Sequence, residues 1–201
     1  VTYIHNPNND PYKKGHYLPQ TPYAGSIWTT YHLKVTVDGV DYTATETMLP
    51  VTKIDSLVNT IDLDEMEDPE EEGRFYEILF YAREPQDRVD HYLFKFYRNG
   101  RTLRDFEGDI YFSEDEFLGE AISGIPTAGY YKVGEFAKVE MYSISREAFI
   151  FYNDLSNLLN NDGGMFTPPP ANPRTNLSNG AFGYFQVSAV DVMEIEVKEL
   201  N

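Results

Sequence analysis

Cysteine is absent from this chain of 201 residues. The absence excludes thiol nucleophiles, disulfide bonds and thiolate-bound metal, because each of them needs that side chain. A core needs neither a disulfide nor a metal here, because a chain of this length buries roughly 70% of its unfolded surface on folding. The length fits one domain, or one domain with an appended arm.

Long apolar runs and positive charge are also scarce. No stretch approaches the roughly 20 apolar residues that cross a bilayer as a helix, and no signal peptide opens the sequence. The chain has 16 Lys and Arg against 33 Asp and Glu, for a net charge of −17. Such a surface repels phosphate backbones and anionic lipids, so we expect no nucleic-acid partner.

Catalytic motifs are missing as well. The four histidines form no His-Glu-x-x-His pattern, no serine lies in a Gly-x-Ser-x-Gly turn, and no Gly-rich loop opens a helix. We therefore expect no metal, no cofactor and no enzymatic activity. A glycoside hydrolase needs only two carboxylates. The 33 acids supply many pairs without singling one out, so this alternative stays open with no catalytic residue named.

Aromatic residues, by contrast, are plentiful: the chain has 16 Tyr and 13 Phe, and both types favour strands. Apolar and polar residues alternate over 27–48 on both sides of Asp38-Gly39, a preferred pair for a two-residue hairpin turn. This pattern predicts an antiparallel hairpin with one buried face. Residues 74–83 are predicted as a central strand and 90–98 as the next, which Asn99-Gly100 ends.

A helix is predicted at about residues 145–160. Ser145 suits an N-cap, and apolar residues then recur three or four apart. The predicted stripe consists of Ala148, Phe151, Tyr152, Leu155, Leu158 and Leu159. Gly163-Gly164 ends the helix, and Pro168–Pro170 stiffen the next segment into a strap that fastens it. From Phe182 to Val197 we predict one long strand with a bulge or a crossing between sheets near its middle.

These elements predict a mainly β protein. We expect an antiparallel β-sandwich or open barrel with one α-helix, about 145–160, packed on the sheet. Residues 1–26 are rich in Pro, Asn and Tyr and are predicted to be an N-terminal arm or loop, with a single β-rich domain over 27–201. His91, within a predicted strand, is interpreted as a surface residue.

Two acidic stretches have alternative interpretations. Residues 62–72 are a calcium loop or a solvated acidic loop, and the missing third oxygen ligand and glycine favour the second. Residues 101–129 combine acids with Phe and Tyr. This combination is found in the lining of sugar and cation sites, and also in loops that anchor themselves to the core. We favour the anchoring loop. If a binding site exists, we expect an exposed aromatic cleft that uses Trp28, Tyr111, Phe112 and Tyr130.

Three segments also carry a family resemblance. SISREAFIFYNDL, FTPPPANPRTNLSNG and FGYFQVSAV resemble the C-terminal signature of a family of Bacteroidetes outer-membrane lipoproteins, the domain of unknown function numbered forty-two forty-nine. YHLKVTVDGVDYTATETMLP, the following IDSL and the block YLFKFYRNG are similar to other parts of that family. The resemblance spans about residues 25–190.

The resemblance implies a setting rather than a reaction. Family members are exported and held at the outer membrane by a lipidated N-terminal cysteine that this chain lacks, so it is expected to be the later part of a longer lipoprotein. They are often encoded beside TonB-dependent receptors. The resemblance thus implies a non-enzymatic cell-surface module that binds a glycan or peptide ligand or assists such a receptor. The alternative is a structural or adhesion domain without a small-molecule site. Asp55-Ser56-Leu57 resembles an O-glycosylation acceptor, which makes Ser56 a predicted modification site.

Overall fold

A computed structural model describes residues 1–5, 15–83, 85–114, 121–160 and 171–200. It consists mainly of antiparallel sheets with one substantial helix, and the sheets do not close into a barrel within these residues. The predicted β-sandwich is therefore confirmed. No helix among the described residues has the length and apolar character needed to span a membrane.

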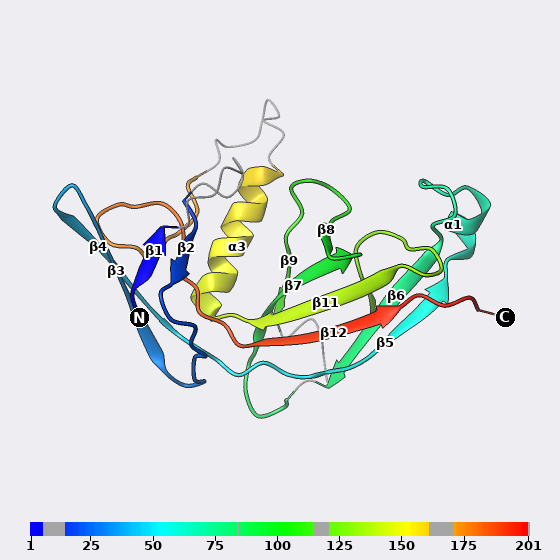
Figure 1. The fold of residues 1–201 in the computed structure, drawn as a ribbon, viewed down its shortest axis with the longest axis horizontal. Coiled ribbons are helices and arrows are strands. Elements are labelled where there is room, and N and C mark those ends of the chain that lie inside the picture. Colours follow the sequence, from blue (N-terminus) through cyan, green and yellow to red (C-terminus); the bar gives the residue numbers. More distant parts are fainter. Residues whose placement is uncertain (6–14, 84, 115–120, 161–170, 201) are drawn as a thin grey trace.

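Two sheets form the sandwich (Figure 1). The three-stranded sheet has the order β10-β6-β5, and the five-stranded sheet has the order β12-β11-β7-β8, with β9 also paired to β7. The first contains β5 (Ile54–Ile61), β6 (Tyr76–Arg83) and β10 (Ala121–Pro126). The second contains β7 (His91–Arg98), β8 (Arg101–Leu103), β9 (Tyr111–Glu114), β11 (Phe136–Ser143) and β12 (Val190–Glu196).

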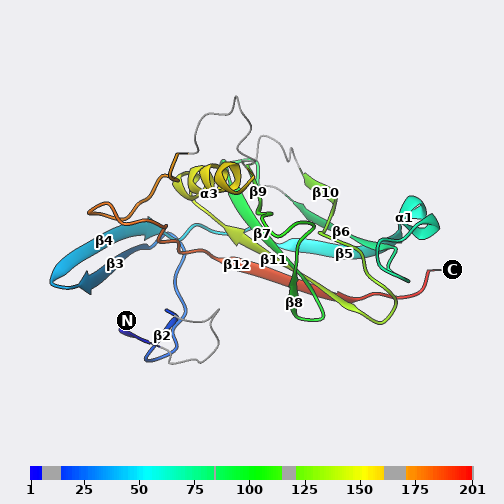
Figure 2. The same ribbon diagram turned by 90° about the horizontal axis from the view of Figure 1, so that it is seen from above.

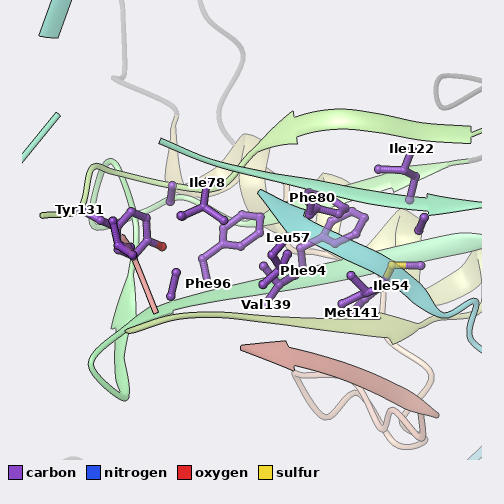
Figure 3. Packing of buried hydrophobic residues seen from close by; sticks show 14 of the residues in the cluster. Ile54, Leu57, Ile78, Phe80, Phe94, Phe96, Ile122, Tyr131, Val139 and Met141 are labelled. Carbon is purple, nitrogen blue, oxygen red and sulfur yellow. The ribbon is translucent and has the colours of Figure 1, made fainter. Parts of the chain in front are cut away.

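The core lies between the two sheets (Figure 3). Phe80 on β6 faces Phe94 and Phe96 on β7, with ring centroids 5.3 and 6.2 Å apart. Val139 and Met141 on β11 complete this layer and are fully buried. The inward residues of β7 share one face of the strand predicted over 90–98, and β6 is the predicted central strand.

The helix α3 (Arg146–Leu159) covers part of the outer face of the five-stranded sheet (Figure 2). Ser145 is its N-cap, as predicted, and its hydroxyl accepts a hydrogen bond from the Ala148 N–H at 3.1 Å. Ala148 is buried against Leu93, but Leu159 at the end of the predicted stripe is 53% exposed. Of the predicted strap, Pro168–Pro170 lie outside the described residues.

Two small sheets lie beside the sandwich (Figure 1). The predicted hairpin forms from β3 (Thr30–Val37) and β4 (Val40–Thr47), and positive φ angles at Asp38 and Gly39 make the turn. Within the first 26 residues, predicted to be an arm or loop, β1 (Tyr3–His5) pairs with β2 (Tyr17–Pro19).

The C-terminal segment fastens the hairpin to α3. The Ser178 hydroxyl accepts a hydrogen bond from the Thr43 N–H at 2.8 Å. The buried carboxylate of Glu46 accepts hydrogen bonds from the hydroxyls of Tyr184 at 2.7 Å and Ser145 at 3.0 Å. The helix N-terminus, the hairpin and the Gly-Tyr-Phe segment therefore meet at one buried acid.

Some predictions of the local structure are wrong. The last strand begins at Val190, and residues 182–189 form no strand. The side chain of Asn176 instead makes two hydrogen bonds to the backbone of Phe185, at 2.8 and 2.9 Å. The short helix α1 (Leu63–Glu67), capped by Asp62, was not predicted. His91 is only 8% exposed because α3 covers it.

Candidate ligand-binding cleft

A cleft of about 420 Å³ lies between α3, β7 and the loop that joins β8 to β9. The helix side is mainly apolar, and the side formed by the sheet and loop combines apolar side chains with all the charged side chains of the lining. The lining consists of Leu93, Phe94, Lys95, Phe96, Tyr97, Thr102, Leu103, Arg104, Asp109, Ile110, Tyr111, Tyr152, Leu155 and Leu159. This mixed lining is typical of small-molecule sites, which combine apolar walls with a few polar groups.

Strand alternation places the polar side chains of the sheet. On β7 the inward positions hold Phe94 and Phe96, so Lys95 and Tyr97 point to the outer face. The register with β11 sets Lys138 opposite Tyr97. The Lys138 ammonium lies 3.9 Å from the centroid of the Tyr97 ring, an arrangement that favours cation–π attraction.

The carboxylate of Glu140, opposite Lys95 on β11, organises this face. It accepts hydrogen bonds from Tyr142 at 2.6 Å, Lys138 at 2.6 Å and Tyr97 at 2.8 Å. Burial alone would raise the pKa of Glu140, but these three donors outweigh burial and lower it. Burial and the hydrogen bond to Glu140 raise the pKa of Tyr97 to about 12. Glu140 is therefore an ionised structural acceptor near neutral pH.

The acidic and aromatic loop between β8 and β9 forms the other wall. Asp105 accepts hydrogen bonds from the Gly129 N–H at 2.7 Å and the Tyr111 hydroxyl at 2.9 Å. Asp109 accepts one from the Phe106 N–H at 2.8 Å. Burial and the Asp105 carboxylate raise the pKa of Tyr111 and outweigh the Asp105 N–H, which lowers it. Asp105 thus anchors the loop, in line with the anchor interpretation, while the loop also forms one wall of a cleft.

The structure does not bring the four predicted cleft residues together. Tyr111 lines the cleft, and Phe112 lies beside it beneath α3, with its ring centroid 5.3 Å from that of Phe149. Trp28 is 63% exposed at the start of the hairpin. The Tyr130 hydroxyl donates to Asp62, the cap of α1, at the opposite end of the molecule (Figure 1).

The acidic stretch 62–72 is organised by ordinary protein contacts. Asp62 accepts hydrogen bonds from the first turn of α1, and Glu71 pairs with Arg74 and Arg98. Within the described residues, no group of three or more His, Asp or Glu is placed to hold a metal ion. The predicted modification site, Ser56, lies half-buried on β5 at a register shift.

The basic residues of the cleft were not among the predicted site residues. Lys95 lay within the strand predicted over 90–98, and Arg104 lay in the stretch 101–129, which was interpreted by its acids and aromatic residues. The alternation of β7 was the one available signal, because it places Lys95 and Tyr97 on the face opposite the core. Nothing in the sequence indicated that α3 would end beside them.

Comparison with known families gives one match. The family described as Domain of unknown function (DUF4249) matches residues 1–194. The chain belongs to DUF4249. The domain family is thus the predicted one, while its outer-membrane lipoprotein setting stays a prediction. The DUF4249 match begins at the first residue, whereas the resemblance described above began near residue 25. No curated protein and no solved structure matches this DUF4249 chain.

Proposed function

We propose that the chain is a non-enzymatic binding module of the bacterial cell surface whose ligand occupies the cleft beside α3. The observation that carries the proposal is the mixed lining of this cleft of about 420 Å³, apolar on α3 and charged at Lys95 of the sheet and at Arg104 and Asp109 of the loop. The setting, an outer-membrane lipoprotein that assists a TonB-dependent receptor, is supported by the resemblance of residues 139–190 to such lipoproteins.

The acids near the cleft support binding over hydrolysis. A general acid needs a raised pKa and a free proton to give. The pKa of Glu140 is lowered, and its carboxylate already accepts three hydrogen bonds. Asp109 accepts a hydrogen bond from the Phe106 N–H and one from the Tyr111 hydroxyl. Each is held as a structural acceptor, which favours a binding role for this cleft.

The test compares native protein purified from cell envelopes with a variant whose cleft is blocked. Thr102 is an exposed residue of β8 that lines the cleft, so Thr102→Trp fills the cleft without changing the core. Thr45→Trp, on the exposed face of the hairpin, is the matched control. Mass spectrometry of the purified proteins should find an outer-membrane receptor and a small molecule with the wild type and control, and no small molecule with Thr102→Trp. Absence of both from the wild type would contradict the proposal.

A second candidate function, adhesion through strand pairing, is favoured by the edge of the hairpin. Within the described residues β3 pairs only with β4. Ser178 and Asn179 hydrogen-bond to the outer edge of β4. No described residue pairs with the outer edge of β3, a strand of eight residues. Its apolar face, with Leu33 and Val35, borders a second hollow of about 420 Å³. An open edge of this length is a template for another strand.

A further inference from the structure

The cleft beside α3 has apolar residues in one part and positively charged residues in another, and this arrangement restricts the class of ligand that fits. Leu155 and Leu159 from the helix, with Ile110 from the loop, supply apolar surface. Leu159 is 53% exposed, although it lies within a row of residues that the helix turns toward the protein. Across the cleft, Lys95 and Arg104 supply positive charge.

Neither cation has a carboxylate partner among the residues that the structure describes. The Lys95 ammonium lies 4.7 Å from the centroid of the Tyr142 ring. One terminal nitrogen of Arg104 donates to the carbonyl oxygen of Glu107 at 3.0 Å, which leaves the rest of its planar fork of donors for other acceptors. Lys138, by contrast, contacts Glu140 at 2.6 Å.

The one acid that lines the cleft is already engaged. An Oδ atom of Asp109 accepts hydrogen bonds from the Phe106 N–H at 2.8 Å and from the Tyr111 hydroxyl at 3.4 Å. Asp109 therefore holds the loop in shape, and no ion pair joins it to Lys95 or Arg104. In a chain with 33 acids and 16 basic residues, this cleft carries more positive than negative side chains.

We propose that the cleft binds a small amphiphile with an acidic head group and an apolar body. The acidic group contacts Lys95 and Arg104, and the apolar body packs on Leu155 and Leu159. A guanidinium and an ammonium together suit a carboxylate or phosphate, through charge-assisted hydrogen bonds. The volume of about 420 Å³ lies within the range of small-molecule sites. This inference rests on the proposed binding function and names the class of ligand.

Calorimetric titration with three probes separates the contribution of the acidic head group to the affinity from that of the apolar body. Octanoate carries both, octan-1-ol keeps the apolar body without the charge, and acetate keeps the charge without the body. We expect octanoate to bind at least about tenfold more tightly than either of the others, because only octanoate gains both sets of contacts. Octanoate with the affinity of octan-1-ol would overturn the acidic head group.

Variants of the cleft residues show whether octanoate binds in the cleft. Lys95→Gln and Arg104→Gln should each weaken octanoate binding by about tenfold and leave octan-1-ol unchanged, because a charge-assisted hydrogen bond is lost. Leu155→Ser should weaken both probes. Lys53→Gln, an exposed lysine outside the cleft lining, is the matched control and should change neither.

The outcomes distinguish the two proposals. If both Gln variants bind octanoate like the wild type while Leu155→Ser loses it, the cleft binds apolar ligands and only the acidic head group is wrong. If no probe binds at millimolar concentration, the amphiphile is wrong, and the envelope purification with Thr102→Trp still decides the binding function by itself.

Discussion

His91 is the residue whose environment differs most from its predicted one. It lies beneath α3, with its ring centroid 5.1 Å from that of Phe149. Strand alternation correctly placed it on the face opposite the Phe94 and Phe96 core. Alternation cannot show whether another element covers that face, because the helix that does so is more than 50 residues later in the chain.

The burial of His91 predicts a pH dependence of stability. Loss of water around the ring lowers its pKa; Arg146 lowers it further, while Glu114, Asp90 and Glu147 raise it. The unfolded chain takes up the proton near pH 6.5 and the folded chain only below that pH, so stability should fall as the pH drops below about 6.5. The slope from this group is at most about 1.4 kcal/mol per pH unit.

Urea unfolding between pH 7.5 and 5 measures this slope. His91→Gln should reduce the loss of stability over that range, whereas the same change at His32, exposed on the hairpin, should not. Equal slopes in the wild type and His91→Gln would show that protonation elsewhere causes the loss.

The helix is the element that the sequence predicted best. Its cap and its length follow from local patterns, and both are confirmed. The strand from Phe182 was predicted by the same reasoning and is wrong in its first half, because aromatic alternation does not reveal whether a partner is present. Strand β12 begins at Val190, which is its first residue paired with β11, opposite Tyr142.

Ser145 has a local and a long-range role, and substitution should separate them. Ser145→Ala removes the cap, which costs about 1 kcal/mol, and also removes one donor to the buried Glu46 carboxylate. We expect a total loss of about 2–4 kcal/mol in the free energy of unfolding, since an under-bonded buried acceptor adds roughly 1–3 kcal/mol.

A double-mutant cycle with Glu46→Leu, which removes the acceptor of the Ser145 hydroxyl, checks this division by urea unfolding. In that background Ser145→Ala should cost only about 1 kcal/mol, the value of the cap alone. The same cost in both backgrounds would mean that the Ser145–Glu46 hydrogen bond contributes nothing to stability.

At the scale of the whole molecule, the sandwich could be predicted but its strand list could not. Strands β5, β8, β9 and β10 were missed because their surroundings are rich in acids and turns, and β1 and β2 were missed because residues 1–26 are rich in Pro and Asn. The cleft was missed for a related reason: it is formed by α3, β7 and the loop after β8, which meet only in the folded protein. Of the four predicted aromatic residues, Tyr111 alone lines it.

The open edge of β3 predicts weak self-association, measurable by light scattering across a concentration series. Lys34 lies opposite Thr43, whose N–H points outward to Ser178, so the N–H of Lys34 points to the open edge. Lys34→Pro removes that donor without removing a bond to β4, and should give a monomer at every concentration. Lys34→Thr should associate as the wild type does. A wild type that is monomeric throughout contradicts the adhesion role.

The bond between Thr43 and Ser178 joins residues that are 135 positions apart, and that between Glu46 and Tyr184 joins residues 138 apart. On the ribosome the N-terminal residues emerge first. The hairpin therefore leaves the exit tunnel long before the segment that fastens it has been made. Until then, the apolar face of the hairpin that carries Leu33 and Val35 lacks the contacts of that segment. Chaperones that bind exposed apolar strands should therefore contact nascent chains that end before residue 176 far more than chains of full length.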